Sequence, residues 1–128
     1  MTDRIQGIVT SCDRRILRYM AGVSLRDRVR SEEVARRCAV DAVETVMRER
    51  RLRWFGHVRR REEEDPVRRV MDLEVDGRRP PGRPRKTWKK TVEDDMRLVG
   101  VREEDALDRG RWRAMTKRQT PVQGNRRR

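Results

Sequence analysis

The chain has 128 residues, enough for one small domain, and a formal net charge of +13. Leu, Ile, Val and Phe together number only 25, so the composition predicts a thin core that needs support from a partner. No apolar run approaches the roughly 18 residues of a membrane span, and the first residues lack the order of a signal peptide. We therefore expect a soluble, intracellular protein.

We expect the first ten residues (1–10) to be flexible and a short helix to cover residues 11–22. Gly22 is a plausible stop for that helix. Ser24 followed by Asp27 has the pattern of an N-cap for the next helix.

The longest predicted helix spans residues 42–61. Its apolar positions recur at spacings of four, seven and four, which places them on one face: Val43, Met47, Trp54 and Val58. Phe55 widens that face. We expect four aromatic residues of the chain to anchor the core, namely Trp54, Phe55, Trp88 and Trp112. In the alternative, one of the tryptophans stacks on a nucleic-acid base.

An acidic break at residues 62–65 precedes Pro66, which fits the first turn of a short helix ending near Leu73. We group residues 11–73 as an N-terminal helical part. The next segment, residues 74–86, holds two glycines and three prolines and reads as an extended basic loop.

The C-terminal part, residues 87–117, is predicted to be a helical pair. Thr87 begins the first helix and Gly100 ends it, and the second covers about 102–117. Residues 118–128 are expected to form a disordered basic tail. The predicted fold is thus mainly α, a small irregular array of about five helices with a long basic Pro/Gly loop.

The positive charge is carried almost entirely by arginine, since only four of the 35 basic residues are lysines. Arginine presents a planar fork of donors that matches phosphate and stacks on bases, so the composition favours a nucleic-acid partner. A GC-rich coding sequence is the alternative explanation, because it enriches arginine without selection for binding.

The charge is also clustered. Residues 48–61 carry a net charge of +6, residues 76–90 carry +6, and residues 111–128 carry +7. We expect the first two blocks to contact RNA or DNA, and the candidate residues are Arg50, Arg51, Arg53, Arg59, Arg60, Arg78, Arg79, Arg83, Arg85, Lys86, Lys89 and Lys90.

The sharpest local motif is the basic Gly-Arg-Pro sequence within residues 78–86, which resembles an AT-hook. In such a hook, an extended arginine lies along the narrow minor groove of A·T-rich DNA. Pro81 departs from that pattern, because a basic residue usually precedes the glycine. A basic linker and a nuclear-localisation stretch over 78–90 are the alternatives, and the second would place the protein in the nucleus.

The candidates for catalysis and metal binding are weak. Glu93, Asp94 and Asp95 resemble a polymerase metal motif, but we expect them on the polar side of their helix, without the third carboxylate that a two-metal site needs. Cys12, Cys38 and His57 are too widely spaced for a metal site. We therefore expect no catalytic centre, no metal and no cofactor.

Four motifs in order carry a family resemblance: LRWFGHV at 52–58, PVRR at 66–69, GRPRKTW at 82–88, and ALDR at 106–109 with WR at 112–113. Their order resembles the C-terminal segment of LINE-type (non-LTR) retrotransposon reverse transcriptases. The resemblance covers roughly residues 14–115.

In that family the polymerase and endonuclease motifs lie upstream of this segment, and the chain does not contain them. The resemblance implies a non-catalytic fragment that holds RNA template or target DNA, with the upstream reverse transcriptase domain as a further partner. The alternative is an inert or protein-interaction fragment that folds only against the polymerase body.

Overall fold

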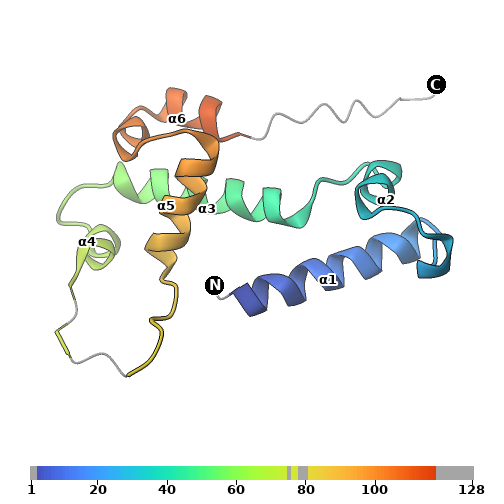
Figure 1. The fold of residues 1–128 in the computed structure, drawn as a ribbon. Coiled ribbons are helices and arrows are strands. Elements are labelled where there is room, and N and C mark those ends of the chain that lie inside the picture. The colour runs from blue at the N-terminus through green and yellow to red at the C-terminus, as the bar shows by residue number, and fades with distance from the viewer. Residues whose placement is uncertain (1–2, 75, 78–80, 118–128) are drawn as a thin grey trace. The chain divides into compact units, whose positions relative to one another are not determined.

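The computed structural model describes residues 3–74, 76–77 and 81–117. Within these ranges the chain is mainly helical, with six α-helices, two short 3₁₀ helices and no strand (Figure 1). The predicted mainly α fold is therefore confirmed. The described residues form two compact units, Asp3–Met47 and Arg48–Lys117, and their boundary falls inside helix α3 (Val43–Arg59).

The first unit begins with helix α1 (Asp3–Met20), followed by the 3₁₀ helix η1 (Leu25–Asp27) and α2 (Ser31–Arg37). The prediction of a flexible N-terminus is wrong for residues 3–10, because the apolar spacing of the later helix extends back through them. With 18 residues α1 is one residue longer than α3, so the predicted helix over 42–61 is not the longest.

The predicted turn after α1 is confirmed. The helix ends at Met20, and Gly22 takes a φ of +64°, which glycine adopts without steric cost. The backbone N–H and the hydroxyl of Ser24 donate to the Asp27 carboxylate at 2.6 and 2.8 Å. Sequence pattern and local hydrogen bonding therefore agree here.

In the first unit, α1 and α2 each bury one apolar side chain. Leu17 of α1 and Val34 of α2 are buried, with exposed fractions of 6% and 1%. Two hydrogen bonds accompany them: the Arg18 Nη2 donates to the Val29 carbonyl at 2.8 Å, and the Cys38 thiol donates to the Leu17 carbonyl at 3.5 Å.

The second unit contains the C-terminal part of α3, then α4 (Pro66–Asp72), α5 (Trp88–Val99), η2 (Glu103–Leu107) and α6 (Arg109–Thr116). As predicted, Pro66 begins α4. Thr87 caps α5 by accepting from the Lys90 N–H, and Gly100 ends that helix at a φ of +79°.

The single helix predicted over 102–117 is wrong, because the segment is divided at Asp108. The Asp108 side chain accepts the backbone N–H of Arg111 at 3.0 Å and so caps a new helix. Aspartate stabilises a helix start better than a helix interior, because its short side chain reaches the free N–H groups of the first turn.

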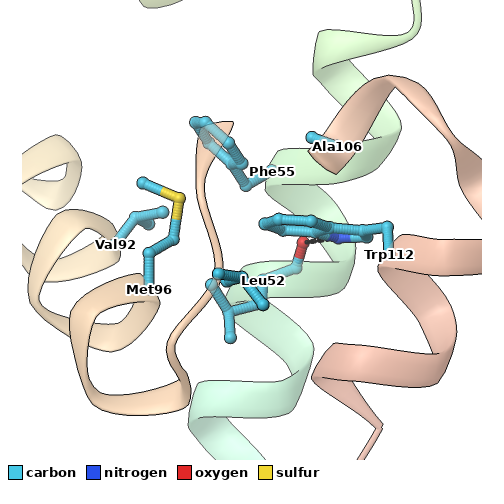
Figure 2. Packing of buried hydrophobic residues seen from close by; sticks show 7 residues of the cluster. Leu52, Phe55, Val92, Met96, Ala106 and Trp112 are labelled. Carbon is cyan, nitrogen blue, oxygen red and sulfur yellow. Dashed lines mark hydrogen bonds between the residues drawn. The ribbon is translucent and has the colours of Figure 1, made fainter. Parts of the chain in front are cut away.

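The core of the second unit brings together α3, α5 and α6 (Figure 2). Its buried members are Leu52, Phe55, Val92, Met96, Val101, Ala106 and Trp112. The Phe55 ring lies 6.0 Å from the Trp112 ring and 6.5 Å from that of Trp88, which packs at the edge of the cluster. Three of the four predicted aromatic anchors therefore serve the core.

Trp54 does not, and the prediction that it anchors the core is wrong, because half of its surface is exposed. At about 100° per residue, Trp54 lies about 200° around the helix from Leu52. The core therefore uses the face of Leu52 and Phe55, which are 0% and 3% exposed. Trp54 points away from it.

A buried ion pair joins α3 to α5. Asp95, 8% exposed, accepts from Arg51 Nε at 2.6 Å and from Arg51 Nη2 at 3.1 Å. The Nε atom of Arg48 lies 3.8 Å from the same carboxylate. Asp95 is thus a structural residue of the helix contact.

Candidate nucleic-acid interface

An open groove of about 880 Å³ lies between α3 and α6, within the second unit. One wall is formed by positions of α3 that recur every three or four residues and so share one helix face, Arg50, Arg53, Trp54 and His57, and by Arg60 and Arg61 just after the helix ends. The α6 wall follows the same spacing with Arg109, Trp112, Arg113, Thr116 and Lys117. Glu49 completes the lining.

The lining is strongly basic, since seven of its twelve residues are arginine or lysine and one is acidic. That acid, Glu49, accepts from Arg53 Nη2 at 2.9 Å. Four further cations line the groove: Arg50, Arg109, Arg113 and Lys117. Among the described residues, no carboxylate forms an ion pair with any of these four. The groove therefore carries an uncompensated positive charge.

Arg60 shows the electrostatic consequence. Its Nη1 donates to the Ala106 carbonyl at 2.6 Å, which holds the guanidinium of this groove residue in place. Burial lowers the pKa of Arg60 below its usual value, and repulsion from Arg109 lowers this pKa further. Arg60, just after α3, and Arg109, the first residue of α6, thus repel each other without a shared carboxylate.

An aromatic pair lies among these cations. The ring centroids of Trp54 and His57 are 5.6 Å apart, one helical turn from each other, with their planes inclined by 37°. His57 is exposed and Trp54 is half exposed. By contrast Trp112 is 2% exposed and its indole N–H is already bonded to the Leu52 carbonyl. The aromatic surface of the groove therefore belongs to Trp54 and His57.

Of the predicted nucleic-acid-binding residues on α3, the structure places Arg50, Arg53 and Arg60 in the groove. Arg51 and Arg59 lie elsewhere. The Arg51 guanidinium is held by buried Asp95.

Arg59 forms ion pairs with Asp72, at 2.8 Å, and with Glu103. Its guanidinium carbon also lies 5.7 Å from the centre of the Phe55 ring. Arg59 therefore makes its contacts within the protein and does not line the groove.

The second predicted block is described in part. Arg78 and Arg79 lie outside the described residues, whereas Arg83 and Arg85 are exposed. The three lysines have acidic neighbours: Lys86 lies 2.9 Å from Asp94, Lys89 lies 3.8 Å from Asp72, and Lys90 lies 3.3 Å from Glu93. The AT-hook interpretation of residues 78–86 stays a prediction.

The polymerase-like triplet has structural partners. Glu93 and Asp94 pair with lysines, and the ammonium of Lys86 lowers the pKa of Asp94 below its usual value. Asp95 is buried, so the prediction that all three acids lie on the polar side of the helix is wrong. The described residues contain no group of three potential metal ligands.

Sequence reasoning missed the basic residues of α6, since Arg109, Arg113 and Lys117 were not among the candidates. Their spacing of four residues was a usable signal, because it places them on one helix face. Nothing in the sequence, however, indicates that this face lies opposite Arg50 and Trp54. That juxtaposition comes from the core contact between α3 and α6.

None of the helices among the described residues is long and apolar enough to cross a membrane. The resemblance to retrotransposon reverse transcriptases rests on the four sequence motifs. No protein-family model, curated protein or solved structure matches the chain.

Proposed function

We propose that this protein is a non-catalytic nucleic-acid-binding module, and that the phosphate backbone lies in the groove between α3 and α6. The observation that carries the proposal is the composition of that groove, with seven cations, one acid and a half-exposed tryptophan. Nucleic acid is the cellular polyanion that combines phosphates with aromatic rings, and it therefore matches both features of the lining.

The electrostatics of the groove favour an anionic ligand. Burial is the main cause of the lowered pKa of Arg60, and repulsion from Arg109 adds to it, so both effects disfavour the charged guanidinium in the absence of an anion. A phosphate between Arg60 and Arg109 would remove the repulsion and add charge-assisted hydrogen bonds. Arg50 and Arg113 extend the same surface along both helices.

The retrotransposon resemblance supports the same function. Its motifs supply core residues from α3 and α6, including Leu52, Phe55 and Trp112, and these hold the two groove walls together. By the resemblance, the ligand would be template RNA or target DNA of a reverse transcriptase, and the site of action would be the nucleus.

The test is a binding titration by fluorescence anisotropy with labelled RNA and DNA at 50 mM salt, followed by a salt series. We expect micromolar affinity or better. If about five phosphates are neutralised, the log–log salt slope should be about −3.5 on a single strand and about −4.5 on duplex DNA. The absence of binding at 50 mM salt would contradict the proposal.

A charge-matched pair of variants locates the site. The groove variant carries Arg50→Glu, Arg109→Glu and Arg113→Glu, whereas the control reverses three exposed arginines outside the groove, Arg14, Arg26 and Arg69. Both variants lose the same net charge. We expect the groove variant to bind at least tenfold more weakly than the control, because only its substitutions remove phosphate contacts. Equal losses would move the interface elsewhere.

A protein-interaction fragment is the second candidate, and one observation favours it. Helix α1 exposes large apolar side chains along its length, among them Ile8, Ile16 and Tyr19, at 60%, 53% and 89%. Under this hypothesis α1 docks on the polymerase body of the resembling family. Circular dichroism of the isolated chain separates the two candidates, because little helix in isolation would favour the fragment and full helix content would favour the module.

A further inference from the structure

The three tryptophans of the chain have unequal roles. Trp112 is 2% exposed with its N–H bonded to the Leu52 carbonyl, and Trp88 packs against the core beside Phe55. Trp54 is half exposed. A large apolar ring left in this position costs the free energy that its burial would provide. Of the three tryptophans, Trp54 is therefore the one whose ring is accessible to a ligand in the groove.

The surroundings of Trp54 define that ligand. Arg50 and Arg53 precede it on the same helix face, and Arg60 and Arg61 follow it. At about 1.5 Å per residue, Arg50 and Arg53 lie within about 6 Å of Trp54 along the helix axis, and Arg60 and Arg61 come just after the helix ends at Arg59. Cations thus flank an aromatic platform along a line, which is the arrangement that a phosphate backbone with one base turned inward requires.

His57 enlarges the platform. Its ring lies 5.6 Å from the indole of Trp54, and both side chains line the groove. A base that stacks on the indole would therefore also contact the imidazole edge. The cations of α6, including Arg109 and Arg113, line the opposite wall, where they can reach the backbone of the same strand.

We infer that the groove binds single-stranded nucleic acid, with one unpaired base stacked on Trp54 beside His57. This inference rests on the proposed function and narrows its ligand. In a duplex both faces of every internal base are covered by neighbouring pairs, so no internal base can stack on a protein ring without being extruded. A single strand presents free faces, and stacking on any base makes the contact tolerant of sequence.

The test compares two probes of twelve nucleotides per strand, an unstructured oligo-dT and a blunt DNA duplex, with oligo-rU as a third arm. We expect the protein to prefer the single strand over the duplex. Trp54→Ala should weaken binding of the single strand about 5- to 150-fold, because one base stack contributes about 1–3 kcal/mol. Duplex affinity should change less than twofold, because only phosphates contact the protein there.

Two variants control this comparison. Tyr19→Ala removes an aromatic ring that is 89% exposed and lies outside the groove, and it should leave both affinities unchanged. Trp54→Phe keeps a smaller stacking surface and should recover part of the single-strand affinity. Because Trp54 is outside the core, circular dichroism of all three variants should match that of the wild type.

The outcomes separate the two proposals. If Trp54→Ala leaves single-strand affinity unchanged while reversal of Arg50, Arg109 and Arg113 weakens it, the stacking inference is overturned and the nucleic-acid function stands. If the reversal also has no effect, the function assigned to the groove fails. Tighter binding of duplex than of single strand would overturn the inference as well. The dT and rU arms decide between DNA and RNA.

Discussion

The indole of Trp112 occupies the space that a side chain on Gly56 would fill. Its Nε1 donates to the Leu52 carbonyl at 2.9 Å, and a Cβ on Gly56 would overlap the Nε1 and Cδ1 atoms of the same ring. Gly56 lies on α3 and Trp112 on α6, so this close approach sets the distance between the two walls of the groove. Figure 2 shows the Trp112 indole and its hydrogen bond to Leu52. Glycine is required here for space.

The first prediction concerns Gly56→Ala. An alanine in a helix interior is usually about 0.8–1 kcal/mol more favourable than glycine. Here we expect a net loss of about 1–3 kcal/mol of unfolding free energy, because the methyl group must displace a buried indole. Urea denaturation followed by tryptophan fluorescence measures the loss.

Gly110→Ala is the control within the same unit. A Cβ at Gly110 meets only the Asp108 carboxylate, at an ordinary contact distance of 3.4 Å. We expect this variant to be as stable as the wild type or slightly more stable. If Gly56→Ala behaved in the same way, the packing of Trp112 against α3 would be wrong.

The second prediction concerns the buried pair of Arg51 and Asp95. Asp95→Ala leaves the Arg51 guanidinium buried without its carboxylate, and we expect a loss of about 3–5 kcal/mol in unfolding free energy. The double substitution of Arg51→Met with Asp95→Leu should recover much of it, since the Arg51 charge is then removed together with its carboxylate and only the more exposed Arg48 loses its ionic neighbour. Asp94→Ala, at a more exposed ion pair, should cost less than Asp95→Ala. A double variant no more stable than Asp95→Ala would contradict this account.

The third prediction concerns the break between η2 and α6. Asp108→Ala removes the acceptor for the Arg111 N–H, and we expect a loss of about 1 kcal/mol. Asp108→Asn keeps a side-chain oxygen and should retain most of the stability. Because α6 carries one groove wall, Asp108→Ala should also weaken nucleic-acid binding under conditions where the helix frays. Equal stability of both variants would argue against a capping role.

The fourth prediction concerns pH. Hydrogen bonds from Arg36 and then Arg37 lower the pKa of Glu33 from 4.5 to about 2. Since the folded pKa is depressed, this group contributes stability that is fully present above pH 4.5 and is lost as the pH falls toward 2. The loss should be small, because the Arg36 side chain is 76% exposed.

Helix content followed by circular dichroism from pH 5 to pH 2 measures this effect. Glu33→Gln should flatten the acid transition relative to the wild type. Glu32→Gln, on an exposed neighbour of the same helix, should leave the transition unchanged and serves as the control. The prediction fails if both variants follow the wild-type curve.

The fifth prediction concerns the basic loop. Arg83 and Arg85 are exposed, and we expect their reversal to glutamate to weaken nucleic-acid binding. Charge reversal within the acidic residues 62–65 should not weaken it. If the loop acts as an AT-hook, A·T-rich duplex should displace a labelled probe from the wild type better than G·C-rich duplex does. The variant with Arg83 and Arg85 reversed should lose this preference. Equal competition would favour a basic linker.

Local signals predicted most of the helix starts and ends. Thr87, Pro66 and Gly100 act through hydrogen bonds and backbone geometry within a few residues, so their effect is readable without knowledge of the fold. The start of α1 was missed because its first residues were expected to be flexible, although Ile5 and Ile8 continue the helical spacing.

The core face of α3 could not be chosen by spacing alone. By spacing, the core face could contain Trp54 and Val58, or it could contain Leu52 and Phe55. In the structure Leu52, Phe55 and Val58 are buried, whereas Trp54 is half exposed. A helix rich in arginine offers several such faces, and the partner helices determine which of them is covered. Trp54 was assigned to the core for this reason.

The sequence by itself determined a helical chain whose positive charge is arginine-rich and clustered, because composition and helix propensity are local properties. The tertiary structure alone decided what each arginine does. Arg51 is neutralised by Asp95, which is distant in sequence, whereas Arg50 faces the groove beside Trp54 and opposite α6. The contact of Trp112 with Gly56 brings the two walls together, and only that packing converts two charged helix faces into one candidate binding site.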